Sequence, residues 1–528
     1  MKHSFRAYTI LLLGVLIVGC GQNNKEFDIV ILNGTVYDGS GEKPYTADIG
    51  IIGDQIAEIG HLSRSASKRK VEAKGLAVAP GFIDMHAHID PIMRLSESES
   101  AVRQGVTTSL GGPDGTSPWP FGPYLDSLET IGVGMNVAYL IGHNTVRRNV
   151  MKLDNRQPNA NELAEMTNQI KQGMQEGAFG ISTGLKYIPG SFSEIDEVIT
   201  LSKAASEEGG IYTSHLREEG LGLMAAVKEA ITISEKADIP VILTHHKVIG
   251  QPMWGKSVQT LAMVDSARNE GLDIKIDQYP YTASYTGISV LIPGWARAGG
   301  NNEFKRRVNT PALRDSIKAG IEFNLITDRG GGDLSRVQFA KVSWMPELEG
   351  KTLKDWAIMK GLEPNVSNGA DLVIEAQVNG GASCVFHAMD EADVERIMQH
   401  PFTMVASDGR LVTPGDGHPH PRWYGTFPRV LGRYVRERGT LTLENAIYKM
   451  TGLPATTLGL TDRGFLKEGQ KADIVLFDPN TVKDNATFEE PHQYSDGIEY
   501  VFVNGSVAVD NGEFKGIKAG KVLRKNKQ

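Results

Sequence analysis

Short apolar runs rich in β-branched residues recur along the middle of the chain, and each run leads to a polar residue or a glycine. Between residues 80 and 408 there are eight such runs, which we expect to be strands: Gly81–Asp84, Val106–Leu110, Val137–Ile141, Phe179–Ser182, Ile211–Ser214, Val241–Thr244, Ile274–Ile276 and Thr403–Ala406. Segments with helical periodicity lie between several of them: Ala160–Glu176, Glu194–Glu208, Leu223–Ala237 and Val258–Glu270. Alternation of strand and helix at roughly 30 residues per unit is typical of a parallel sheet, and eight units predict an α/β fold of the (β/α)₈ barrel type.

The alternation is interrupted between Pro280 and Phe402. A gap of this length inside a barrel is too long for a simple loop. We therefore predict an inserted subdomain over about residues 284–395, which includes the glycine-rich turn Arg329–Asp333 and folds over the barrel mouth.

The two ends of the chain carry similar alternating patterns. Residues 27–37 and 47–59 read as β segments with Asn-Gly and Gly-Asp turns, and residues 472–477 and 499–509 repeat that pattern. Segments this short cannot bury a core alone. We expect residues 27–78 and 465–520 to form one small β-sandwich beside a barrel over 79–464; the alternative is a separate domain at each end.

The first residues read as a targeting segment. Basic residues precede the apolar run Tyr8–Val18, which is too short to span a bilayer but suits a signal peptide. The run ends in Ile17-Val18-Gly19-Cys20, which resembles the lipobox of bacterial lipoproteins. We expect residues 1–20 to be a lipoprotein signal peptide, Cys20 to be lipidated, and the domain to be anchored to a membrane of the bacterial cell envelope, facing the periplasm or the exterior. The alternatives are an ordinary signal peptide and a buried N-terminal strand.

Composition limits the classes of partner and of metal site that the chain can have. The chain has 528 residues with 55 basic and 63 acidic side chains, a net charge of −8, which argues against a nucleic-acid partner. It has two cysteines, Cys20 and Cys384, which excludes a disulfide scaffold and a cysteine-based zinc finger. If Cys20 carries lipid, the mature chain has no intrachain disulfide, and any metal site has to be built from nitrogen and oxygen ligands.

Histidines and one carboxylate lie at the ends of predicted strands. His86 and His88 follow the first strand, and residues i and i+2 of an extended segment point to the same side, so both can reach one metal ion. His215 ends the fifth strand, His245 the sixth and Asp408 the eighth. The carboxyl ends of barrel strands converge at one face, so this pattern predicts a metal site there.

These motifs resemble the amidohydrolase superfamily, and more closely its N-acyl-D-amino-acid deacylases (D-aminoacylases). The resemblance rests on the following stretches: Pro80 to His88 (PGFIDMHAH), Ser182-Thr183-Gly184, His215 to Gly220 (HLREEG), His245 to Gly250 (HHKVIG), Ser407-Asp408-Gly409, His420-Pro421-Arg422 and Gly425 to Arg429 (GTFPR). It implies a metal-dependent barrel with a flanking β-sandwich, zinc as the usual ion, and hydrolysis of the amide of a small N-acyl-D-amino acid.

The sequence departs from this family at one ligand position. Members commonly place a metal-binding cysteine in a Gly-Asn-Cys-Gly stretch after the second strand, where this chain has Gly112-Pro113-Asp114-Gly115. Asp114 either supplies an oxygen ligand instead or is only a turn residue. Many superfamily members bridge two metals with a carboxylated lysine after the fourth strand, and we favour an N-carboxylated Lys186 in that role over a lysine in an ordinary salt bridge.

The inferred centre holds two divalent ions, with His86, His88 and Asp408 on one, His215 and His245 on the other, and Lys186 between them. A metal-bridged hydroxide attacks the amide carbonyl. Asp408 then carries the proton to the leaving amine.

Substrate-binding positions match the family by motif. They place Arg422, Lys247, and Tyr187 or Tyr281 on the substrate carboxylate. The alternatives are that Arg422 braces a loop and that Tyr281 only packs.

Two other functions remain open from the sequence. One is a different amidohydrolase, such as an isoaspartyl dipeptidase or a dihydropyrimidinase-like cyclic amidase. The other is a surface lipoprotein that binds metal without turnover. The sequence makes no prediction of oligomeric state.

Overall fold

Residues 26–525 are described by the structure, a computed structural model of the chain. The predicted signal peptide and its lipidation site Cys20 lie outside these residues. Within residues 26–525, no helix is long and apolar enough to cross a membrane.

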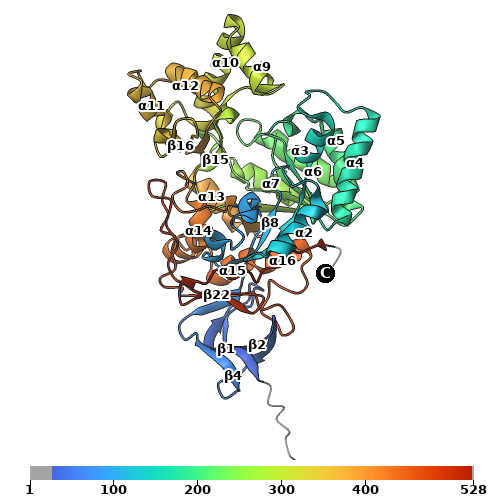
Figure 1. Cartoon of the computed structure of the whole chain (residues 1–528), viewed down its shortest axis with the longest axis vertical. Coiled ribbons are helices and arrows are strands. Elements are labelled where there is room, and N and C mark those ends of the chain that lie inside the picture. The colour runs from blue at the N-terminus through green and yellow to red at the C-terminus, as the bar shows by residue number, and fades with distance from the viewer. Residues whose placement is uncertain (1–25, 526–528) are drawn as a thin grey trace, which may run out of the picture.

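Parallel strands form a central barrel, as the hydrophobic pattern predicted (Figure 1). In chain order they are β6 (Phe82–Asp84), β8 (Val106–Gly111), β9 (Asn136–Tyr139) continued by β10 (Ile141–Gly142), β11 (Gly180–Gly184), β12 (Ile211–His215), β13 (Val241–Leu243), β14 (Ile274–Gln278) and β18 (Thr403–Val405). Neighbours along the chain pair in parallel. The first and last strands meet beyond their ends, where β7 (Ala87–His88) pairs with β19 (Gly409–Arg410). These pairings bring the ends of all eight strands to one face.

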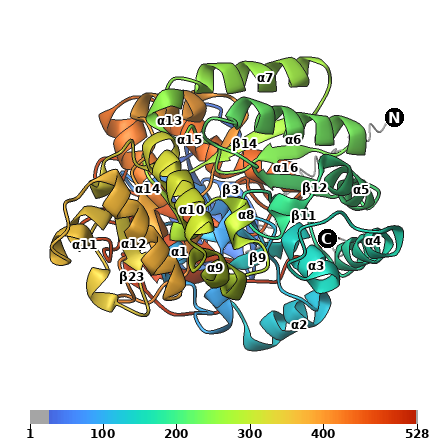
Figure 2. The same ribbon diagram turned by 90° about the horizontal axis from the view of Figure 1, so that it is seen from above.

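Helices cover the outside of the barrel (Figure 2). The four predicted helices are confirmed within two residues at each end: α4 (Ala160–Gln175), α5 (Ile195–Ser206), α6 (Leu223–Ala237) and α7 (Ser257–Asn269). On α6 the buried apolar residues recur three or four apart and form one stripe, from Leu223 and Val227 to Ile233. Further helices are α2 (Phe121–Ile131), α3 (His143–Met151), α13 (Glu391–Gln399), α14 (Arg422–Arg429), α15 (Leu443–Met450) and α16 (Gly452–Leu458).

Strands from both chain ends share one nine-stranded sheet, as the similar patterns at the termini predicted. The N-terminal strands are β1 (Phe27–Val36), β2 (Tyr45–Ile52), β3 (Gln55–Gly60), β4 (Ser67–Glu72) and β5 (Ala77–Pro80); the C-terminal ones are β20 (Ile474–Phe477), β21 (Ile498–Val503), β22 (Ser506–Asp510) and β23 (Glu513–Phe514). The two sets join where β5 pairs antiparallel with β20. Their apolar residues form one core that combines both ends, for example Ile49 with Ile474. The limits of 27–78 and 465–520 as domain boundaries stay a prediction.

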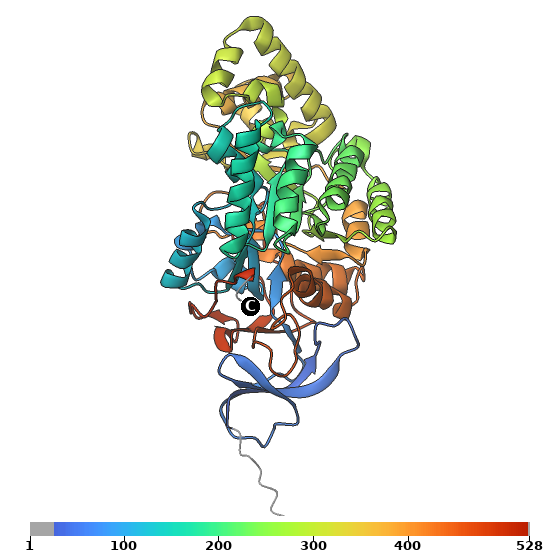
Figure 3. The same ribbon diagram turned by 90° about the vertical axis from the view of Figure 1, so that its right-hand side faces the viewer.

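Residues 284–386, between β14 and β18, form a layer at the opposite end of the molecule from the terminal sheet (Figures 1 and 3). It contains the antiparallel strands β15 (Ser284–Gly287), β16 (Val337–Lys341) and β17 (Ser383–Phe386), with α8 (Gly294–Arg297), α9 (Asn301–Val308), α10 (Pro311–Asn324), η5 (Leu325–Arg329), α11 (Leu353–Met359) and α12 (Val366–Val378). Its apolar residues form a core of their own around Trp356 and Phe339. Residues of this segment, among them Ser284 and Arg329, form one wall of a cavity at the barrel mouth.

Candidate metal and active site

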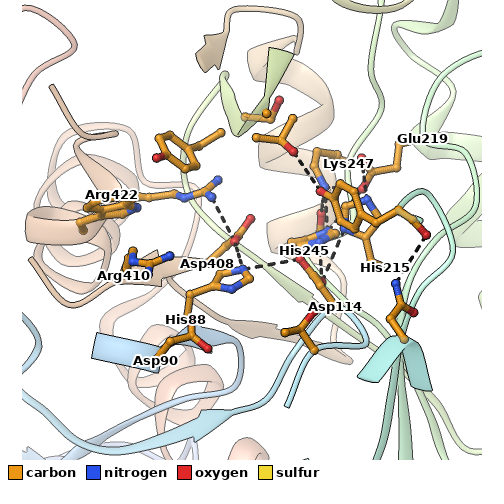
Figure 4. Close-up of a pocket in the computed structure, with 18 of the residues that line it drawn as sticks. His88, Asp90, Asp114, His215, Glu219, His245, Lys247, Asp408, Arg410 and Arg422 are labelled. Atoms are coloured by element: carbon orange, nitrogen blue, oxygen red, sulfur yellow. Dashed lines mark hydrogen bonds and ion pairs between the residues drawn. The ribbon is translucent and has the colours of Figure 1, made fainter. Parts of the chain in front are cut away.

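The polar residues predicted at strand ends converge in the structure. His86 and His88 follow β6, Asp114 follows β8, His215 ends β12, His245 follows β13, and Asp408 follows β18. Their ligand atoms form two groups, each within 4.8 Å: His86, His88, Asp114 and Asp408, and Asp114, His215 and His245. Figure 4 shows Asp114 between His88 on one side and His215 and His245 on the other.

Local backbone geometry turns three of these side chains into the site. Asp114, His245 and Asp408 have φ values of 53°, 37° and 45°, in the left-handed region that non-glycine residues seldom adopt. Each of these residues lies two or three positions beyond the end of its strand, where left-handed backbone bends the chain sharply. The side chain is then presented across the strand ends rather than along the strand.

The spacing of the ligand atoms fits a metal centre. Asp114 Oδ1 lies 3.5 Å from His86 Nε2, 3.5 Å from His215 Nδ1 and 3.3 Å from His245 Nε2, and Asp114 Oδ2 lies 3.5 Å from His88 Nε2. Asp408 Oδ1 lies 3.6 Å from His86 Nε2 and 3.3 Å from His88 Nε2. Two atoms that coordinate one tetrahedral ion at about 2.1 Å are about 3.4 Å apart. The separations therefore match those of ligands around shared cations.

Several of these buried atoms also have no hydrogen-bond partner. They are His86 Nε2, Asp114 Oδ1, and His215 Nδ1 and Nε2. A buried polar atom without a partner is costly, and native proteins seldom leave several together. Cations held among His86 Nε2, Asp114 Oδ1 and His215 Nδ1 would satisfy these three atoms, whereas His215 Nε2 faces Glu219.

The charges in the site favour a cation as well. Burial alone would raise the pKa of Asp114 and of Asp408, but histidines around both, and Arg422 beside Asp408, hold the two pKa values below the ordinary range. Burial lowers the pKa of His86 to about 3. Both carboxylates are thus anionic at neutral pH, and His86 offers a free nitrogen lone pair.

Residues behind the ligands hold the histidine rings. His86 Nδ1 lies 2.6 Å from Thr244 Oγ1, and the Thr244 hydroxyl donates to Asp277 at 2.7 Å. Glu219 Oε1 lies 3.3 Å from His245 Nδ1, and Glu219 Oε2 lies 3.8 Å from His215 Nε2. Sequence reasoning missed Glu219 and Asp277. Glu219 could have been predicted, because it lies in the His215–Gly220 motif. Asp277 lies near the end of strand β14, which carries no histidine that would indicate a metal site.

Lys186 does not join the ligand cluster. Its ammonium donates to Glu218 at 2.7 Å and lies 3.9 Å from Asp328. In the structure Lys186 thus lies in the ordinary salt bridge that was the alternative to a carboxylated bridge, and Asp114 lies between the two histidine pairs.

A cavity of about 390 Å³ opens beside the ligands. Tyr187, Lys247 and Arg422 line it, as predicted. Arg422 is buried, its Nη2 lies 3.0 Å from Asp408 Oδ1, and its Nε and Nη1 have no partner. The Arg422 guanidinium stacks 4.5 Å from the centre of the Tyr279 ring, which fixes its orientation. Arg422 therefore has donors ready for an anion.

Lys247 and Tyr281, the other residues predicted to contact substrate, are held by contacts within the protein. The Lys247 ammonium donates to Glu219 and to the His245 carbonyl, and its Nζ lies 2.7 Å from His245 Nδ1, so Lys247 is engaged within the protein. Tyr281 is fully buried outside the cavity lining and packs edge-on against His420, with Arg429 over its ring. Of the two tyrosines predicted as alternatives for the substrate contact, Tyr187 lines the cavity, and the packing alternative describes the position of Tyr281. Arg329, at the end of η5, contributes an unpredicted cation to the cavity wall.

Comparisons with known proteins agree with this geometry. Residues 69–249 and 328–509 match the Amidohydrolase family. A D-aminoacylase of Alcaligenes xylosoxydans xylosoxydans is 36% identical over 95% of this chain and 98% of that protein. A crystal structure of N-acyl-D-glutamate deacylase from Bordetella bronchiseptica, complexed with zinc and a phosphonate inhibitor, matches with a TM-score of 0.81 and 34% identity over 95% of this chain and 100% of that one. A D-aminoacylase structure described by its binuclear metal centre matches with a TM-score of 0.81 and 35% identity over 94% of this chain and 100% of that one.

Proposed function

The chain belongs to the amidohydrolase family, and from this we propose that it hydrolyses the amide bond of N-acyl-D-amino acids to a D-amino acid and a carboxylic acid. The observation that carries the proposal is the pair of ligand groups at the barrel mouth, which share Asp114 and open into a cavity lined by Arg422. The activity itself comes from the relatives: one is a D-aminoacylase and another an N-acyl-D-glutamate deacylase.

We assign two divalent ions, zinc in the first instance, to the two ligand groups. His86, His88 and Asp408 hold one ion, and His215 and His245 hold the other. When bound, the ions lower the pKa of a water molecule toward about 7 and polarise the scissile carbonyl.

The chain's own residues position the substrate and move the proton. The Arg422 guanidinium binds the substrate carboxylate through a free nitrogen, Nε or Nη1, together with the adjacent Nη2, which also faces Asp408. Asp408 takes the proton of the attacking water and delivers it to the amine nitrogen, because an amine leaves poorly unless it is protonated. Arg422 holds the pKa of Asp408 low, so an incoming carboxylate that shares the guanidinium makes Asp408 a better proton acceptor.

A substrate panel on the full mature chain tests this function. Purified protein loaded with zinc is assayed on matched N-acetyl-D- and N-acetyl-L-amino acids, an isoaspartyl dipeptide and a dihydropyrimidine. Release of free amino acid from the D series is expected. Preference for the L series, the dipeptide or the ring would reject the deacylase, and a fully metallated protein inert on all of them would favour a binding protein.

We also propose that Cys20 is lipidated and that the enzyme is held at a membrane of the bacterial cell envelope. The support is the sequence pattern of residues 1–20. The first described strand, β1, lies in the terminal sheet, at the end of the molecule opposite the β15–β17 segment (Figure 1). A tether there would leave the cavity wall built by that segment directed away from the membrane. Incorporation of labelled palmitate that disappears in Cys20→Ala is expected, and unchanged labelling would overturn the proposal.

A further inference from the structure

Asp114 is the one residue, among those the structure describes, that belongs to both candidate metal groups. We propose that its carboxylate bridges the two metal positions, so that the centre is built from nitrogen and oxygen alone and accepts harder divalent cations, such as Mn²⁺, as well as Zn²⁺. This inference rests on the proposed function, because it takes the two groups to be occupied together.

The two oxygens of Asp114 face different ligands. Oδ1 is directed at His215 and His245 and also at His86, whereas Oδ2 approaches only His88, at 3.5 Å. A carboxylate that bridges two cations gives one oxygen to each. The arrangement has the form that a bridge needs, with one oxygen toward the His215 group and the other toward the His88 side.

A role as an ordinary turn residue does not account for Asp114. In a turn held by an aspartate, the carboxylate accepts a hydrogen bond from a backbone N–H two residues later. Here the Thr116 N–H donates to the Pro113 carbonyl at 3.0 Å. The Asp114 side chain is nine-tenths buried, and its Oδ1 has no hydrogen-bond partner.

The turn around Asp114 is instead held by a neighbouring strand. Ser182 Oγ on β11 donates to the Gly112 carbonyl at 2.6 Å and accepts from the Gly115 N–H at 3.1 Å. A Cβ on Gly112 would lie 2.3 Å from the Leu140 carbonyl oxygen, so the loop packs tightly against β9 and β10. Since these contacts fix the loop, the Asp114 carboxylate is free to act as a ligand.

The chemistry of the ligand set points to harder cations. Among residues 26–525 the one cysteine is Cys384, which is buried in the core around Trp356. The group with Asp408 contains two carboxylates and two imidazoles. Thiolates select soft ions, imidazole suits zinc and other transition ions, and carboxylates suit manganese and magnesium. A centre without sulfur therefore discriminates less against Mn²⁺ than one bridged by a thiolate.

Metal binding to the full mature chain tests the bridge with Zn²⁺, Mn²⁺ and Cd²⁺ as separate probes. The variants are Asp114→Asn and Asp114→Cys, with Asp90→Asn as a control that lines the same cavity outside both groups. Stoichiometry after dialysis and dissociation constants from chelator competition are measured, with circular dichroism to verify folding. The Co²⁺ form of Asp114→Cys is also examined for a thiolate-to-metal charge-transfer band.

The wild type and Asp90→Asn should bind two ions, and Asp114→Asn should lose at least 100-fold in affinity at both positions. Asp114→Cys should keep Zn²⁺ and Cd²⁺, lose at least tenfold for Mn²⁺ relative to Zn²⁺, and show the charge-transfer band. Two ions at wild-type affinity in folded Asp114→Asn, or an unchanged Mn²⁺-to-Zn²⁺ ratio in Asp114→Cys, would overturn the bridge even if the D-substrates are hydrolysed. A wild type that shows the expected metal binding but no deacylation would remove the proposed function and leave the bridge standing.

Discussion

Glu219→Gln is the substitution that most directly tests how the metal site is supported. Glu219 is 2% exposed and surrounded by positively charged groups and histidines: Lys247, Arg329, His215 and His245. Burial alone would raise its pKa, but Lys247 and the two histidines hold it well below the ordinary range, so Glu219 is anionic at neutral pH. Glutamine keeps the shape and removes the charge.

Two effects follow from these contacts. Lys247 donates to Glu219, and Arg329 Nη2 lies 3.6 Å from it, so the substitution leaves two buried cations without their shared anion. Breaking a buried ion pair costs about 3–5 kcal/mol of folding stability. Glu219 also lies 3.3 Å from His245 Nδ1, and loss of such a partner behind a metal-binding histidine weakens metal affinity about 10–100-fold.

The neighbouring residue provides a matched control. Glu218 pairs with Lys186 at 2.7 Å, and their side chains are 34% and 15% exposed. Because this pair is partly solvated and outside the ligand groups, Glu218→Gln should cost about 1 kcal/mol or less and leave metal affinity unchanged. Zinc affinity by chelator competition and the thermal midpoint of metal-free protein are measured for both variants. Zinc affinity of Glu219→Gln within twofold of the wild type would contradict a supporting role for Glu219 at the metal site, as would equal losses in the two variants.

Three further predictions concern charge. Arg422→Lys should reduce kcat/KM about 10–100-fold, mainly through KM, because an ammonium cannot make the two-pronged contact; an unchanged KM for N-acyl-D-amino acids would contradict this. Burial lowers the pKa of His88, but Asp114 and Asp408 raise it overall to about 10 in metal-free protein. Zinc binding should therefore release protons and tighten as pH rises from 6 to 9, which calorimetry in buffers of different ionisation enthalpy detects; buffer-independent heats would be inconsistent. Burial lowers the pKa of Lys449 to about 7. Since the unfolded chain binds more protons above pH 7, the wild type should gain about 2 kcal/mol of stability relative to Lys449→Met between pH 7 and 9; parallel curves in denaturant titrations would argue against it.

The barrel could be predicted because its signal is local. Each strand is buried on both faces and reads as a short apolar run, and each covering helix repeats apolar residues at three and four positions. The ends of parallel strands must meet, so His86, His215, His245 and Asp408 could be brought together without coordinates. The inserted segment could be predicted only as an interruption of the alternation of strands and helices. That it delivers Arg329 to the cavity depends on packing between distant parts of the chain.

The choice between Asp114 and Lys186 shows where this reasoning stops. Both follow barrel strands, and resemblance favoured the lysine. What separates them is the direction of each side chain, set by the left-handed backbone at Asp114 and by the carboxylate that meets Lys186. The spacing of residues in the sequence predicts neither of these two side-chain directions.

The same limit explains the contrast between Glu218 and Glu219. The two are identical in type and adjacent after β12, and no periodicity applies to residues in a loop. The Glu218 side chain points to Lys186, and the Glu219 side chain points into the barrel mouth toward Lys247 and two histidines. In the interior the four surrounding groups stabilise the anion, which in turn offsets the mutual repulsion of Lys247 and Arg329 and their repulsion of an incoming cation. Glu219 thus stabilises a lysine, an arginine and two histidines beside a metal position. The difference in zinc affinity and stability between Glu219→Gln and Glu218→Gln measures this stabilisation separately from the general effect of losing a glutamate.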